Sequence, residues 1–162
     1  MGYRSEVCIA VQMDNNDEES VKNWHLFIAE LKADPVCAIA IKDLTSGKTC
    51  TAINSTKYGE GVENEEGIDM KNCSLYVHFS DVKWYDSDKW VESYNRIIGK
   101  ASHYCDDPHF GMSACFLRVG EETTDIQEER YGEMGYDLAY ISTPYICEAS
   151  ELSFDPDNKL IE

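Results

Sequence analysis

Residues 74–104 constrain the fold of this chain more than any other stretch, because they contain a complete strand, a turn and a helix. Apolar and polar side chains alternate up to about Trp84, which is typical of a strand with one buried face. Asp86, Ser87 and Asp88 then supply residue types that are typical of a helix N-cap and first turn, so a helix is expected to start here. Beyond them, large apolar residues recur at steps of three and four, and this spacing predicts a helix over 87–104 with one buried face: Trp90, Tyr94, Ile97, Ala101 and Tyr104.

The other apolar runs predict the remaining elements. A second set of residues has helical spacing and predicts a helix over 17–32, ended by Asp34 and Pro35: Val21, Trp24, Ile28 and Leu31. Short apolar runs predict strands over 3–13, 36–41, 110–119 and 136–147, with a weak strand over 49–53. The stretch 121–131 is predicted to form a short acidic helix.

These elements predict an α+β fold. We expect a single two-layer domain over 1–148, in which two main helices pack on a mixed or antiparallel sheet of about five strands. Residues 42–72 are rich in glycine and polar residues, so they are expected to form a loop-rich insert. The last residues, 149–162, are expected to be a frayed tail.

The charge of the chain limits its partners. With 31 Asp or Glu against 14 Lys or Arg, the net charge is -17, and such a surface repels nucleic acid and anionic membranes. No apolar run is long enough to span a bilayer, and the first residues do not resemble a signal peptide, so we expect a soluble, intracellular protein. The acid is concentrated at residues 119–162, which hold 12 Asp or Glu and 2 Lys or Arg.

The sequence offers little support for a metal, a cofactor or a disulfide. The 7 cysteines are odd in number and include no C-x-x-C pair, so they are interpreted as small core residues. A set of residues after the second helix includes donor types that bind zinc, but structural zinc sites usually contain paired cysteines: His103, Cys105, Asp106, Asp107 and His109. We therefore predict no metal site and no cofactor.

Catalytic motifs are also missing. The stretch 46–49 ends like a phosphate-binding P-loop, but Lys42 stands where that motif needs glycine. No G-x-S-x-G sequence occurs, and no cysteine has the basic surroundings that activate a thiol. The sequence therefore favours a protein that is not an enzyme.

Two groups of residues are candidates for a binding surface. The main candidate is the acidic stretch near the C-terminus, where aligned carboxylates would enter a Lys/Arg groove that normally binds phosphates: Glu121, Glu122, Asp125, Glu128, Glu129, Glu133 and Asp137. The alternative for these residues is that they only keep the protein soluble. The second candidate is the aromatic turn formed by Trp84, Tyr85 and Trp90, although aromatic residues at such positions more often belong to the core.

Three stretches carry a resemblance: MGYRSEV at the N-terminus, DVKWYDS at the end of the strand predicted up to about Trp84, and FLRVGEE leading into Asp125. They resemble small uncharacterised proteins of tailed bacteriophages, over the N-terminal strand and most of 74–147. The resemblance implies an accessory protein in the host bacterial cytoplasm that inhibits a defence system, of anti-CRISPR or anti-restriction type. Its partner would be a host defence protein with a basic groove, which the chain would occupy as a DNA mimic. The resemblance brings no catalytic residue with it.

Two other functions stay open at this stage. The chain would bind a small nucleotide signal if the basic residues in and near 74–104 formed a phosphate pocket: Lys83, Arg96, Lys100 and Arg118. A small metal-dependent or hydrolytic enzyme is the other alternative. The sequence does not specify an oligomeric state.

Overall fold

The computed structural model describes residues 3–46, 67–122, 124–142 and 145–148. Its elements are, in chain order, β1 (Ser5–Met13), α1 (Glu18–Ala33), α2 (Pro35–Ser46), β2 (Gly67–Asp69), β3 (Ser74–Val82), α4 (Lys89–Cys105), β4 (Met112–Gly120), β5 (Ile126–Tyr131), β6 (Ala139–Ser142) and β7 (Tyr145–Glu148). The weak strand predicted over 49–53 and the tail 149–162 lie outside the described residues.

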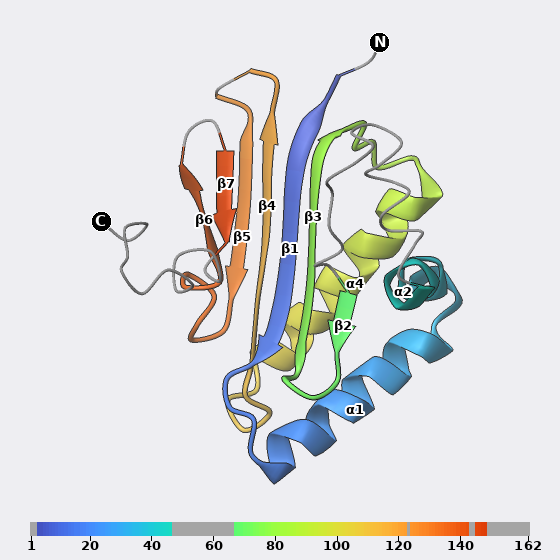
Figure 1. The fold of residues 1–162 in the computed structure, drawn as a ribbon, viewed down its shortest axis with the longest axis vertical. Coiled ribbons are helices and arrows are strands. Elements are labelled where there is room, and N and C mark those ends of the chain that lie inside the picture. The colour runs from blue at the N-terminus through green and yellow to red at the C-terminus, as the bar shows by residue number, and fades with distance from the viewer. Residues whose placement is uncertain (1–2, 47–66, 123, 143–144, 149–162) are drawn as a thin grey trace.

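Five strands form one antiparallel sheet in the order β2-β3-β1-β4-β5, and β6 and β7 form a separate hairpin (Figure 1). β1 lies at the centre, where Ile9 pairs with Val77 of β3 on one side and with Phe116 of β4 on the other. The predicted α+β fold, with helices on a sheet of five strands, is confirmed. The sheet is antiparallel rather than mixed.

The helices α1, α2 and α4 cover one face of the sheet and enclose the main core (Figure 1). α1 begins where the side chain of Asp17 accepts a hydrogen bond from the amide of Ser20, and it buries Trp24, Phe27 and Leu31. α4 contributes the predicted buried face, including Tyr94, Ile97 and Ala101. Five rings from β3, β4, α4 and the β3–α4 turn pack together, with centroids 5.2–6.5 Å apart: Phe79, Trp84, Trp90, Tyr94 and Phe116.

The β6–β7 hairpin covers part of the other face of the sheet. Leu138 and Ala139 pack against a second, smaller core on β1 and β4, which includes Cys8, Cys115 and Leu117. β1 is therefore buried on both faces, and this explains why its sequence is apolar throughout its middle rather than alternating. The single strand predicted over 136–147 is in fact this two-stranded hairpin.

The strand predicted over 36–41 is wrong, because these residues belong to α2. Asp34 caps this helix through a hydrogen bond from the amide of Val36 to its carboxylate, and Pro35 occupies the first helical position, where a missing N–H costs nothing. Cys37, Ala40, Ile41 and Leu44 then share one buried face. Asp34 and Pro35 therefore end one helix and start the next.

The acidic helix predicted over 121–131 is also wrong, because its second half is the strand β5. Glu129 pairs with Phe116 and Glu128 with Leu117 across the β4–β5 ladder. A helix would place Glu121 beside Asp125, one turn later, and like charges at this spacing destabilise a helix. Pairing with β4 avoids that repulsion and satisfies the backbone of both strands.

No helix among the described residues combines the length and the apolar character that crossing a membrane requires.

Candidate binding site

We call residues 121–137, which include β5, the acidic segment. Its side chains do not form one row, because alternate residues of a strand point to opposite faces. Gln127, Glu129 and Tyr131 lie on the face of the sheet that the helices cover, where they line one cleft. Glu128 and Arg130 lie on the other face, near the β6–β7 hairpin. The carboxylates predicted as a single surface are therefore divided between the two faces and the two ends of β5.

Asp125 is held inside an ion pair. Nη2 of Arg118 donates to Oδ1 of Asp125 over 2.7 Å, and the hydroxyl of Tyr3 donates to Oδ2 over 2.7 Å. The guanidinium of Arg118, followed by the Tyr3 hydroxyl, holds the pKa of Asp125 below its ordinary value. This carboxylate fixes the turn before β5 to β4 and the N-terminus, so it is structural.

Glu128 is neutralised by Arg130, whose side chain is only 6% exposed. Nε of Arg130 donates to Glu128 over 2.7 Å, while Nη1 donates to the carbonyls of Gly135 and Ala139 over 3.0 and 2.8 Å. The guanidinium also lies 5.1 Å from the ring of Tyr136. Arg130 thus ties the loop after β5 to the strand, and Glu128 completes that contact.

The carboxylates without such a role lie beside the two ends of β5. Glu121 accepts a hydrogen bond from the backbone amide of Arg4, while Glu122, Glu133 and Asp137 are exposed and make no ion pair within the described residues. A six-residue strand is about 17–20 Å long, so the two groups are separated by roughly that distance. These four side chains are the part of the predicted surface that remains available to a partner.

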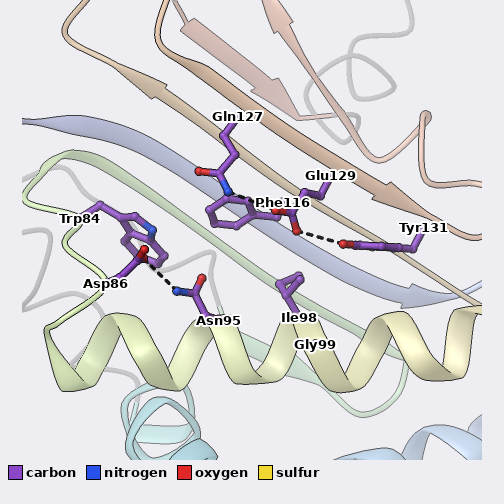
Figure 2. A pocket seen from close by; sticks show the side chains of 9 residues that line it. All are labelled: Trp84, Asp86, Asn95, Ile98, Gly99, Phe116, Gln127, Glu129 and Tyr131. Atoms are coloured by element: carbon purple, nitrogen blue, oxygen red, sulfur yellow. Dashed lines mark hydrogen bonds between the residues drawn. The ribbon is translucent and has the colours of Figure 1, made fainter.

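A cleft lies between β5 and α4, with a volume of about 280 Å³ (Figure 2). Its lining includes the aromatic rings of Trp84 and Phe116, whose centroids are 5.9 Å apart, and the side chain of Ile98. Polar groups line the rest: Asp86, Asn95, Gln127, Glu129 and Tyr131, with Gly99 on α4. The cleft is slightly smaller than the roughly 300–1,000 Å³ of usual ligand pockets, and most of its lining residues are polar, so it has room for one side chain rather than for a large ligand.

The carboxylate of Glu129 is fixed in this cleft by its neighbours on the same face of β5. Nε2 of Gln127 donates to Oε2 over 3.1 Å, and the hydroxyl of Tyr131 donates to Oε1 over 3.0 Å (Figure 2). Burial raises the pKa of Tyr131, and its hydrogen bond to Glu129 raises it further, so this phenol remains a donor at neutral pH. Glu129 is therefore an oriented acceptor.

The lining of the cleft favours positive ligands. It includes two carboxylates, Asp86 and Glu129, and no Lys or Arg among the described residues. Arg118 lies beside it, but its guanidinium is already bound to Ser5, Asp125 and Gln127. A phosphate would meet carboxylates here without a neighbouring cation to bind it, whereas an ammonium or guanidinium group would meet carboxylates and aromatic faces.

Three of the four basic residues considered for a nucleotide site bind carboxylates: Arg96 and Lys100 share Asp34, and Arg118 pairs with Asp125. Arg96 binds Asp34 over 3.0 Å, and Lys100 binds Glu30 and Asp34 over 3.2 and 3.3 Å, all toward α1 and α2. Arg118 belongs to the separate pair with Asp125. Because each of these three cations already has a carboxylate partner, the structure offers little support for a phosphate pocket built from them.

No group of three or more His, Cys, Asp or Glu side chains within the described residues has the arrangement needed to hold a metal ion. Burial raises the pKa of Cys105 to about 12, which keeps it protonated and makes it a poor ligand. In the part of the chain that the structure describes, no disulfide links the cysteines: Cys8, Cys37, Cys73, Cys105 and Cys115.

The aromatic turn is divided between core and surface. Trp84 is 8% exposed and Trp90 is half-buried, and both pack against Phe79, so they stabilise the core. Tyr85 is 38% exposed, and its hydroxyl accepts a hydrogen bond from the amide of Tyr3. Of the three, only Trp84 lines the cleft.

Sequence reasoning missed most residues of the cleft: Asp86 as a lining residue, Asn95, Ile98, Gly99, Phe116, Gln127 and Tyr131. The alternation of Gln127, Glu129 and Tyr131 would have placed these three side chains on one face if the segment had been interpreted as a strand. The contribution of α4 depends on how that helix crosses the sheet, which the sequence does not specify.

Comparison of the chain with protein-family models, with curated proteins and with solved structures found no match. The likeness to bacteriophage proteins therefore stays a prediction, and the function is argued from the residues.

Proposed function

We propose that this protein binds a positively charged surface of another protein through the acidic segment. The observation that carries the proposal is that Glu121, Glu122, Glu133 and Asp137 lie at the ends of β5 without a neutralising side chain within the described residues. Asp125 and Glu128, by contrast, are neutralised internally. The segment is thus held in place by two ion pairs and has an excess of negative charge.

The partner that fits is a nucleic-acid-binding protein. A Lys/Arg groove that binds duplex DNA meets about one phosphate charge per 1.7 Å, and carboxylates at the ends of β5 compete for the same cations. The net charge of -17 adds long-range attraction, which raises the rate of encounter. An inhibitor of a host defence system, anti-CRISPR or anti-restriction in type and acting in the host bacterial cytoplasm, would use such a surface, and this is the specific role that we propose.

The test is a charge reversal at three of the four available carboxylates, and Glu121 is kept because it accepts a hydrogen bond from the amide of Arg4. Glu122→Lys, Glu133→Lys and Asp137→Lys are combined, and the matched control combines Glu19→Lys, Glu92→Lys and Asp106→Lys, which change the net charge equally at exposed positions elsewhere. Each protein is used as bait in a bacterial lysate, and captured proteins are identified by mass spectrometry.

We expect the wild type and the control to capture the same nucleic-acid-binding protein, and the triple reversal in the acidic segment to lose it. Added duplex DNA and higher salt should release the captured protein, because both compete with the carboxylates. Equal capture by all three baits, or capture that DNA does not reduce, would contradict the proposal. Melting temperatures of the three proteins check that each is folded.

A further inference from the structure

We propose that an extended segment of the partner adds to the open edge of β5 and places an arginine or lysine side chain in the α4–β5 cleft. The inference rests on the proposed function for one point, that the partner is a basic protein. It adds the place of contact, the backbone conformation of the partner and the side chain that it inserts.

The first support is the position of β5 in the sheet. β5 is the last strand in the order β2-β3-β1-β4-β5, and within the described residues it pairs only with β4 (Figure 1). An edge strand presents a row of unpaired N–H and C=O groups, which another chain can satisfy by adding a strand. Alternate residues of β5 direct these groups to the open edge, namely Ile126, Glu128 and Arg130, because Gln127, Glu129 and Tyr131 direct theirs to β4. The N–H of Ile126 already donates to the carbonyl of Thr124, so Glu128 and Arg130 are the main pairing positions.

The second support is the direction of the side chains. Gln127, Glu129 and Tyr131 lie on the cleft face of β5, so every second residue of an added strand would lie on that face as well. A residue directly opposite Glu129 would have its Cβ atom about 4.5–5.5 Å from that of Glu129. Its side chain would project over the cleft between β5 and α4 (Figure 2).

The third support is the chemistry of the cleft. The two hydrogen bonds from Gln127 and Tyr131 orient the Glu129 carboxylate and use about two of its roughly four acceptor positions. Asp86 adds a second carboxylate, and the rings of Trp84 and Phe116 add aromatic surface. A guanidinium or ammonium group satisfies both features, through charge-assisted hydrogen bonds and contact with aromatic faces.

A second copy of the chain fits this edge less well. In a symmetric dimer through this edge, a two-fold axis normal to the sheet would relate the two β5 strands, and each face of the sheet would continue into the same face of the second copy. A residue on the cleft face must therefore pair with another residue on the cleft face. Of the two registers with the greatest overlap, one places the two Glu128 side chains opposite each other, and the other places the two Glu129 side chains opposite each other. Like charges directly opposite each other are destabilising. The second register also places Glu128 opposite Arg130 of the other copy, but Arg130 is only 6% exposed and already binds its own Glu128 and two carbonyls, so a basic foreign segment is the better occupant.

The experiment uses the full chain and an acetylated, amidated heptapeptide, Thr-Val-Thr-Arg-Thr-Val-Thr, as the probe. One control peptide has Gln in place of Arg, and another has the Arg but N-methylated amides that cannot pair with an edge strand. Two protein variants are matched, Glu129→Gln in the cleft and Glu128→Gln on the opposite face of the same strand. Affinity is measured by titration, and the contact is located from the amide resonances of the labelled protein.

We expect the Arg peptide to shift the amide resonances of β5 and of Gly99, and to bind about tenfold more tightly than the Gln peptide. Glu129→Gln should remove that difference, while Glu128→Gln should preserve it. The N-methylated peptide should bind at least about tenfold more weakly, since it loses the backbone pairing. Unchanged spectra away from the site show that the variants are folded.

The inference is overturned if the Arg and Gln peptides bind equally, if neither binds, or if the two Glu variants behave alike. It is also overturned if β5 is the contact in a dimer of this chain, seen as concentration-dependent sedimentation that the Arg peptide does not reverse. These results are separate from those of the lysate experiment. If peptide binding depends on Glu129 but the triple reversal still captures the partner, the cleft proposal stands and the proposed role of the acidic segment is wrong. If the triple reversal loses the partner but peptide binding does not depend on Glu129, the role of the acidic segment stands and the cleft proposal is wrong.

Discussion

We call residues 74–105, which include β3 and α4, the β3–α4 unit. This unit and the acidic segment line opposite sides of the same cleft, but they are stabilised in different ways (Figure 2). In the β3–α4 unit, Leu75, Val77 and Phe79 of β3 and Tyr94 and Ile97 of α4 are fully buried. In the acidic segment, β5 is half-buried or exposed at every residue, and its contacts centre on Arg118 and Arg130.

This difference determines which side chains are available to bind a partner. Burial of apolar surface stabilises the β3–α4 unit throughout, so nearly every inward side chain there is needed for packing. The acidic segment depends on a few polar contacts, which leaves its other side chains available to bind. An edge strand of this kind can add a partner without rearranging the core.

The largest effect is expected from truncation in the β3–α4 unit. Ile97→Ala removes a side chain that has no exposed surface, and it should lower the free energy of unfolding by about 2–5 kcal/mol through lost burial and the cavity left behind. Chemical denaturation monitored by circular dichroism measures this change. The control on the same helix is Glu92→Ala, which is exposed and loses only a first-turn carboxylate, so it should cost less than about 1 kcal/mol. Equal stability of the two variants would show that α4 does not contribute its predicted face to the core.

The same difference explains what the sequence could predict. The spacing of Trp90, Tyr94, Ile97 and Ala101 indicates which face of α4 is buried, so the helix and its packing were predicted correctly. The short run 36–41 has no such spacing, because a buried helix and a buried strand both appear as continuous apolar residues. There the deciding signal was Asp34 followed by Pro35, which is a helix start as well as a helix end.

The acidic segment was predicted least well, because its structure depends on long-range polar contacts. Nothing in the sequence indicates that Arg118 binds Asp125, or that Arg130 binds the carbonyls of Gly135 and Ala139. The residues that form the cleft with β5, such as Asn95 and Phe116, are distant in the chain. Residue types alone therefore identified the acid-rich stretch but not its geometry.

A moderate effect is expected from the polar contacts of the acidic segment. Arg130→Ala should lower the free energy of unfolding by about 1–3 kcal/mol, because it leaves the carbonyls of Gly135 and Ala139 without their donor and Glu128 without its cation. The matched control is Arg96→Ala, whose side chain is 50% exposed in its pair with Asp34 and should contribute about 0–1 kcal/mol. Urea denaturation measures both. If Arg130→Ala costs no more than Arg96→Ala, the loop after β5 is not held by this side chain.

The smallest effect is expected from acid, and it compares one carboxylate from each region. Arg96 and the amide of Val36 hold the pKa of Asp34 at about 2, and Arg118 and Tyr3 lower the pKa of Asp125 from its ordinary value of 3.8. Because each pKa is lower in the folded state, each carboxylate stabilises the protein at a pH above its unfolded-state pKa, and that contribution is lost as the pH falls through its folded-state pKa.

Melting temperatures of the wild type, Asp34→Asn and Asp125→Asn, measured from pH 6 to pH 2, should therefore differ most at pH 6 and converge toward pH 2. A constant offset between either variant and the wild type over this range would show that its carboxylate has the same pKa in the folded and unfolded protein, and that the ion pair contributes no pH-dependent stability.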